Sequence, residues 1–192
     1  MKIEFVIPAY KKPHHLMTII SSIFAQSSDD WFIHVVFDGP QDGVNDKVVD
    51  YYKDSDKIQF TTLPKRMNDW GHTPRNYGLE NAKEEWVLMT GDDNYYAPKF
   101  VELMLKAVEP DVHFIHCDMI HNWVNNDYFY IKTVPAAGKI DIGNFITRTH
   151  LSKQMKLNVE NKVADGIFVE DYLKKFPTGR VAHVPRGLYV HN

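Results

Sequence analysis

Two adjacent carboxylates, Asp92 and Asp93, come just after the apolar run Trp86–Met89, with Thr90 and Gly91 between. Such a run is typical of a buried strand, and two carboxylates at its dry end would repel each other. A divalent cation would relieve this repulsion, because Mg²⁺ and Mn²⁺ prefer one or two carboxylates together with substrate phosphates. The pair therefore predicts a metal–phosphate site, while Gly91 and Asn94 leave open a simple solvated turn.

Polar residues also follow two earlier apolar runs. Asp38 ends the run Phe32–Phe37, where its carboxylate could accept a hydrogen bond from the N–H of a base. The alternative is an ordinary turn residue. A phosphatase with an aspartate nucleophile at this strand end usually needs a second Asp two residues later, where this chain has Pro40. Ala9–Lys11 follow the first run, Ile3–Ile7, in the same way.

Arg75 lies in the first turn of a helix predicted over residues 74–82, with Thr73 as its N-cap and Pro74 as its first residue. A cation at this end of a helix opposes the helix dipole. The placement suits a phosphate ligand, and a surface arginine is the alternative.

The second half of the chain contains three acids in one predicted helix: Asp165, Glu170 and Asp171. A carboxylate at the mouth of a site could deprotonate an acceptor hydroxyl. The alternatives are N-capping by Asp165 and solvent exposure of the other two. The ten histidines show no zinc-ligand spacing. His191 is an exception, since the last strand could return beside the metal site.

The predicted elements alternate between strands and helices up to about residue 120, which indicates a largely parallel sheet with helices on both faces. Beyond Asn122 the pattern mixes short strands and helices, and it closes with strands at 180–184 and 188–190. In such sheets ligands bind beyond the carboxyl ends of the strands. The polar residues after the first, second and fourth strands should therefore converge on one crevice.

Length and composition narrow the class of protein. The 192 residues fit a single domain, with 44% hydrophobic and 24% charged residues. A net charge of −3 gives no reason to expect a nucleic-acid partner. Cys117 is the one cysteine, so no internal disulfide forms and a cytoplasmic location is expected. No apolar run is long enough to span a membrane; peripheral association with one, and membership of a longer chain, stay open.

Five segments stand in the same order as the motifs of one enzyme family: Phe5–Lys12, Ile19–Ser27, Val35–Gly39, Arg75–Ala82 and Thr90–Asn94. The first is similar to an apolar strand followed by Pro-Ala-Tyr-Asn-Arg, the third to Val-Val-Asp-Asp-Gly, and the fourth to Ala-Arg-Asn-x-Gly-x-x-x-Ala. The fifth resembles the family's acidic metal motif. Together they make the chain resemble a family 2 glycosyltransferase of the GT-A fold, over most of its length.

The resemblance implies a Rossmann-like α/β domain of three layers with a mixed, mostly parallel central sheet. A single catalytic domain would cover residues 1–192, with about 1–95 as the nucleotide-binding half and about 96–192 as the acceptor side. The donor would be a nucleotide-diphosphate sugar, with UDP favoured. The acceptor would be a glycan, a lipid-linked or a protein hydroxyl, and Mn²⁺ or Mg²⁺ the cofactor.

The family's roles carry over residue by residue. Pro8, Ala9, Tyr10 and Lys11 would border the nucleotide, with Tyr10 on the base. Asp38 would bind the uracil N–H, Arg75 the base or diphosphate, and Asp92 the ribose or the metal. Asp93 would ligate the metal. Asp165 resembles the catalytic base, and Glu170-Asp171 resembles another version of that motif.

Two departures from the family pattern matter. Thr90 stands where a further Asp is frequent, which leaves Asp93 with fewer carboxylate partners and makes His191 a candidate ligand. Lys11 stands where Asn is usual. The implied reaction is an inverting displacement that needs one base and no enzyme nucleophile. A nucleotidyltransferase, which usually carries a Gly-rich loop after the first strand, and a non-catalytic sugar-nucleotide binder are the alternatives.

Overall fold

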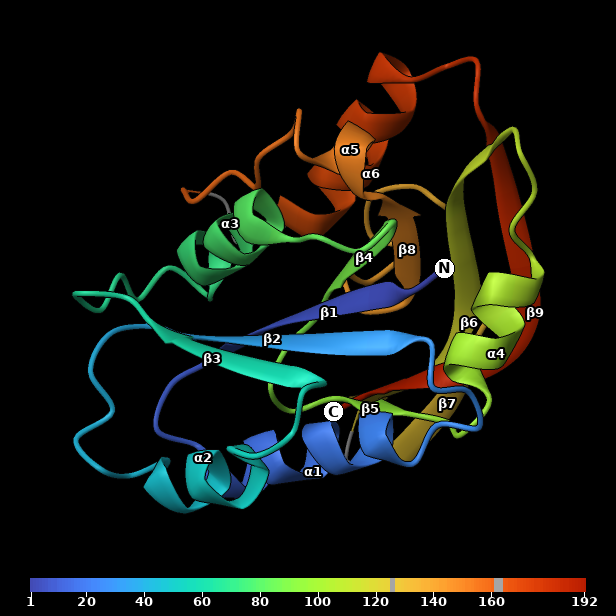
Figure 1. Cartoon of the computed structure of the whole chain (residues 1–192). Coiled ribbons are helices and arrows are strands. Elements are labelled where there is room, and N and C mark those ends of the chain that lie inside the picture. The colour runs from blue at the N-terminus through green and yellow to red at the C-terminus, as the bar shows by residue number, and fades with distance from the viewer. Residues whose placement is uncertain (125–126, 161–163) are drawn as a thin grey trace.

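The first part of the central sheet is parallel (Figure 1). This computed structural model describes residues 1–124, 127–160 and 164–192. Strand β1 (Ile3–Ala9) lies between β2 (Trp31–Phe37) and β4 (Trp86–Met89), and β3 (Ile58–Thr62) pairs with β2. Every residue of β1 is buried, because helices cover both faces of the sheet.

The second part of the sheet is mixed. Strand β8 (Phe145–Arg148) pairs antiparallel with both β4 and β6 (Val112–Val124). Strand β9 (Arg180–His191) runs parallel to β6, and β5 (Tyr95–Tyr96) pairs antiparallel with β9. Strand β7 (Asp127–Ile131) pairs with the far end of β6. The order along the sheet is β3-β2-β1-β4-β8-β6-β9-β5, so β7 is an additional edge strand.

Helices cover the two faces of this sheet and complete three layers (Figure 1). Residues from α1, α2 and α4 pack in one core cluster, and residues from α3 and α6 pack in the other. The helices are α1 (Pro13–Phe24), α2 (Asp46–Tyr52), α3 (His72–Asn81), α4 (Phe100–Lys106), α5 (Thr149–Ser152) and α6 (Ala164–Lys175). The expected α/β architecture with a mostly parallel mixed sheet is confirmed. Within the described ranges, no helix is long and apolar enough to cross a membrane.

Two local predictions were wrong. The closing strands at 180–184 and 188–190 form one strand, β9, because register shifts opposite Cys117 and Asp118 absorb the intervening residues. Helix α3 begins at His72 rather than Pro74, and Asp69 accepts hydrogen bonds from the backbone and hydroxyl of Thr73.

Gly71 sets how α3 enters the fold. Its φ of 81° is a left-handed conformation that L side chains rarely adopt. A Cβ at this position would also lie 2.9 Å from the Cβ of Pro8. The chain therefore passes close over the end of β1 just before α3 begins, which brings the start of α3 to the carboxyl end of the sheet.

Candidate active site

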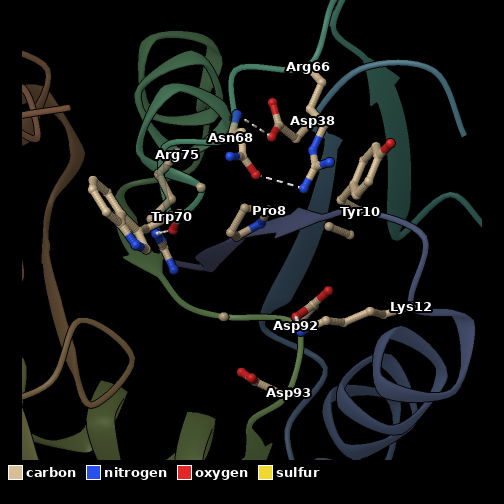
Figure 2. Close-up of a pocket in the computed structure, with 13 residues that line it drawn as sticks. Pro8, Tyr10, Lys12, Asp38, Arg66, Asn68, Trp70, Arg75, Asp92 and Asp93 are labelled. Carbon is tan, nitrogen blue, oxygen red and sulfur yellow. Dashed lines mark hydrogen bonds and ion pairs between the residues drawn. The ribbon is translucent and has the colours of Figure 1, made fainter. Parts of the chain in front are cut away.

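The carboxyl ends of β1, β2 and β4 open onto a cleft of about 400 Å³, the first cleft (Figure 2). Its position is the one expected for a ligand site in an open α/β sheet. The predicted nucleotide-site residues all line it except Lys11. The lining residues are Pro8, Ala9, Tyr10, Lys12, Asp38, Arg66, Asn68, Trp70, Gly71, Arg75, Gly91, Asp92 and Asp93.

Two neighbouring lysines after β1 point in different directions. The backbone amide of Lys11 donates to Oε1 of Gln41 at 2.8 Å, and its ammonium pairs with Asp42. Lys12 instead lines the first cleft, with Nζ 4.0 Å from Oδ1 of Asp92 (Figure 2). The cation that this turn supplies to the cleft is therefore Lys12. The sequence could not show which of two adjacent lysines turns inward.

Asp38 is buried and holds the loop before α3. Its Oδ1 accepts a hydrogen bond from the amide of Met67 at 2.8 Å, and its Oδ2 accepts one from the amide of Asn68 at 3.0 Å. Each carboxylate oxygen keeps a further lone pair. Asn68 and Trp70 have left-handed φ angles of 55° and 57°, which non-glycine residues adopt only at a cost. Asp38 therefore stabilises a strained loop that lines the cleft.

Arg66 supplies a positive group that the sequence gave no reason to single out. Its guanidinium carbon lies 4.0 Å from the centroid of the Tyr10 ring. One of its nitrogens donates to Oδ1 of Asn68 at 2.7 Å. Figure 2 shows Arg66, Asp38 and Tyr10 together at one end of the cleft, with Asp92 and Asp93 at the other. One end of the cleft thus presents the ring of Tyr10 with the guanidinium of Arg66, and the other end presents two carboxylates.

The acidic end can hold a metal ion. One ligand atom each from His15, Asp92 and Asp93 lies within 4.8 Å of the other two. Burial raises the pKa of Asp92, Lys12 opposes this, and the charge of Asp93 adds to it. Two carboxylates and an imidazole suit Mn²⁺ and can accept Mg²⁺, so the donor set fits the predicted cofactor. His15 lies on α1, and no spacing in the sequence indicates that it reaches these acids.

Thr90 has a structural role at the position where the family frequently has an acid. Thr90 is fully buried. Its hydroxyl accepts a hydrogen bond from Nδ2 of Asn94 at 3.2 Å, and its carbonyl accepts one from Nε of Arg75 at 2.9 Å. The hydroxyl of Thr90 takes part in this buried network without adding a charge to it. The replacement therefore fits the packing of this strand end.

Arg75 is buried and lies between two loops. Besides its bond to Thr90, it donates from Nη1 to the carbonyl of Trp70 at 2.9 Å. Burial lowers the pKa of Arg75, and nearby acids, Asp141 foremost, oppose that shift. After these two bonds the guanidinium keeps three of its five N–H donors. Arg75 can therefore hold the loop and still face an anion.

A second cleft, of about 190 Å³, adjoins the first and shares Trp70, Arg75, Gly91 and Asp93 with it. Asp165 lines this second cleft from the first turn of α6. Burial raises the pKa of Asp165, while a hydrogen bond from the amide of Gly166 at 2.8 Å opposes the shift. The second cleft is lined by Trp70, His72, Arg75, Gly91, Asp93, Asn94, Asp141, Ile142, Leu157, Asp165 and His191.

The other two predicted acids lie elsewhere. Glu170 and Asp171 are exposed farther along α6 and line neither cleft. Oε1 of Glu170 accepts a hydrogen bond from the amide of Ala137 at 2.9 Å. This placement favours Asp165 as the candidate base.

His191 lines the second cleft, as does Asp93. However, Nε2 of His191 lies 3.4 Å from Oδ2 of Asp141. His191 does not belong to the cluster of possible metal ligands formed by His15, Asp92 and Asp93. Asp141 also accepts hydrogen bonds from the Tyr189 hydroxyl at 2.6 Å and the Gly143 amide at 2.9 Å. The sequence did not single out Asp141, because it lies in a loop with no motif around it.

Comparisons with known proteins identify the family and the fold. The sequence model described as "Glycosyl transferase family 2" matches residues 4–168. An uncharacterized glycosyltransferase of Haemophilus influenzae is 24% identical over 131 residues, which are 67% of this chain and 42% of that protein. The chain thus matches less than half the length of that relative.

Solved structures show the same fold at low identity. The structure of S. aureus TarS in complex with UDP-GlcNAc aligns with 99% of this chain and with 58% of the TarS chain. The TM-score is 0.80 and the sequence identity is 18%. The mannosyltransferase PcManGT of Pyrobaculum calidifontis, in complex with GDP-Man and Mn²⁺, matches 99% and 56% with a TM-score of 0.76 and 14% identity. The chain therefore belongs to glycosyl transferase family 2 and has the GT-A fold.

Proposed function

We propose that this glycosyltransferase moves a sugar from a UDP-sugar to an acceptor hydroxyl, with a divalent metal and with inversion at the anomeric carbon. One observation carries the proposal: an acidic corner around Asp93 and a half-buried carboxylate, Asp165, face two adjoining clefts. Residues 1–95 would form the donor side, and residues 96–192 the acceptor side. The first cleft then holds the nucleotide and diphosphate, and the second holds the sugar and acceptor.

The donor assignment rests on the polar end of the first cleft. Tyr10 and Arg66 offer a ring and a guanidinium against which a base can stack, and Asp38 lies beside them. The cations Lys12 and Arg75 line the same cleft and suit a diphosphate. Uracil is favoured because one structural neighbour was solved with UDP-GlcNAc, although another holds GDP-Man.

The metal assignment rests on Asp92, Asp93 and His15, whose ligand atoms cluster at the acidic corner. When bound there, Mn²⁺ or Mg²⁺ would neutralise charge on the departing diphosphate. Burial disfavours the ionised form of Asp92, and a bound cation would favour that form. His191 pairs with Asp141 and is left out of this proposed ligand set.

The base assignment rests on Asp165. Its raised pKa makes it a stronger base than an exposed aspartate, provided that it is ionised at the working pH. In the proposed step, Asp165 takes the proton of the acceptor hydroxyl, and that oxygen forms a bond to the anomeric carbon. The bond from this carbon to the diphosphate oxygen breaks, and the nucleoside diphosphate leaves with the electron pair. A single displacement of this kind inverts the anomeric centre.

A nucleotide-sugar panel tests the proposal. Thermal unfolding is measured with UDP-, GDP-, ADP- and CMP-sugars, with and without Mn²⁺, because a ligand that binds the native state raises the unfolding temperature. We expect the largest metal-dependent rise for one UDP-sugar, and slow hydrolysis of that donor. A rise without any turnover would instead favour a non-catalytic binder, and no rise with any donor would refute the proposal.

A further inference from the structure

Three rings form a row across three neighbouring strands. The pairing register places His191 of β9 beside His121 of β6, and His121 beside Phe129 of β7. Residues paired in this way point to the same face of a sheet. The two imidazoles stack with ring centroids 4.2 Å apart and an interplanar angle of 12°. We call His191, His121 and Phe129 the ring row.

The ring row continues the second cleft outward. His191 lines that cleft, as does Asp165. One step back along the same strands, the paired residues Tyr189, Met119 and Ile131 belong to or pack against the hydrophobic core. Phe129, by contrast, is 51% exposed. The ring row is therefore the place where this face of the sheet leaves the core and meets solvent.

The length of the row sets the size of a ligand. Adjacent strands lie about 4.8 Å apart, so β7 lies about 10 Å beyond β9. That span matches roughly two sugar rings laid end to end. A ligand hydroxyl beside Asp165 could thus belong to one sugar while the next sugars of the same chain lie along the row.

The chemistry of the row suits sugar rings. Burial, together with the neighbouring His191, lowers the pKa of His121, which keeps this ring neutral near pH 7. Neutral aromatic faces attract the weakly positive C–H face of a pyranose, while its hydroxyls stay in water. Groups that can accept hydrogen bonds from sugar hydroxyls lie at the inner end, where the carboxylates of Asp141 and Asp165 line the second cleft.

We propose that the ring row is an acceptor subsite that holds the penultimate sugars of an oligosaccharide. This inference rests on the proposed function, since it takes the second cleft as the place where the acceptor hydroxyl reacts. It adds that the acceptor is a saccharide of at least two units, bound by stacking on the exposed ring of Phe129 beside the stacked pair His121 and His191.

The test is the dependence of transfer on acceptor length. Using the UDP-sugar that most raises the unfolding temperature, transfer is measured to glucose, galactose, mannose and N-acetylglucosamine and to their oligomers of up to four units. For the best series we expect the acceptor KM to fall about tenfold from one to three units. Phe129→Ala should remove this gain and leave kcat within about twofold, and Phe129→Trp should restore it.

Tyr128→Ala is the matched control, because Tyr128 is equally exposed on the same strand but points to the opposite face. It should retain the length dependence. An unchanged length dependence in Phe129→Ala, or donor hydrolysis without transfer to any saccharide, would refute the subsite and leave the proposed function intact. Absence of both donor binding and donor hydrolysis would refute the proposed function, and this inference with it.

Discussion

Replacing Asp38 by Asn should loosen the loop that lines the first cleft. Asp38 accepts two backbone hydrogen bonds, and bonds to a charged group contribute about 1.5–3 kcal/mol each. The loop contains two left-handed non-glycine residues, Asn68 and Trp70, which cost about 1 kcal/mol or more each. An asparagine keeps one acceptor oxygen and turns an amide N–H₂ toward the other donor. We therefore expect the substitution to cost about 2 kcal/mol, which is about the free energy needed to hold the two strained residues in their observed conformation.

The measurement is UDP affinity by calorimetry, where 2 kcal/mol corresponds to about thirtyfold. The comparison ligand is N3-methyl-UDP, which lacks the uracil N–H. If Asp38 acts through the loop, Asp38→Asn weakens both ligands equally. If Asp38 binds the uracil N–H, methylation and mutation each remove the same bond, so the mutation costs nothing further with the methylated ligand. Asp42→Asn, at an exposed ion pair with Lys11, should leave both affinities unchanged. Wild-type UDP affinity in Asp38→Asn would contradict both roles.

Three further changes have defined outcomes. Asp165→Asn should slow transfer by about 10²–10⁴-fold. Because burial raises the pKa of Asp165, its ionised form costs stability in the folded state, so the unfolding temperature of the variant should stay equal or rise; a fall would contradict this. For the same reason, wild-type transfer should decline on acidification at a higher pH than an ordinary aspartate titrates. His15→Ala should weaken Mn²⁺ binding, followed by water proton relaxation, by about tenfold or more, whereas His14→Ala should not; equal affinities would remove His15 from the metal site. Gly78→Ala should lower stability in chemical denaturation by about 1–3 kcal/mol, because its methyl group would overlap Val6; unchanged stability would mean that α3 shifts freely.

The sequence predicted those residues of the candidate site that lie just after buried strands. Asp38, Asp92 and Asp93 could be identified because an apolar run fixes where a strand ends, and parallel strands bring their carboxyl ends to one edge. Arg75 could be identified because it is an unfavourable residue for the first turn of a helix. In each case a local pattern determines both the element and the place of the side chain on it.

The remaining residues of the candidate site depend on loop paths and on the packing of helices against the sheet. Asp141 lies in a loop, where it lines the second cleft and contacts Tyr189 and His191. His15 is on the exposed side of α1 and meets Asp93 through the packing of α1 beside the strand end. His191 was expected near the metal, and the structure does place it in a cleft with Asp93. Local sequence could not show that Asp141 would be its nearest acid.

Arg75 and Asp38 hold the same loop from opposite ends, which makes their effects on the donor site interdependent. Asp38 binds the amides of Met67 and Asn68, while Arg75 binds the carbonyl of Trp70. Arg75→Lys keeps the charge but cannot reproduce the planar donor pair that reaches both Trp70 and Thr90. Once either tie is lost and the loop opens, losing the second should cost little more.

The double variant Asp38→Asn/Arg75→Lys therefore should lose less UDP affinity than the sum of the two single losses, with a coupling of about 1 kcal/mol or more. Calorimetric titration of the four proteins at one Mn²⁺ concentration measures this coupling. If the single losses add within about 0.5 kcal/mol, the two residues act independently. Arg75 would then contribute through the diphosphate alone, and the strained loop would not be the element that they share.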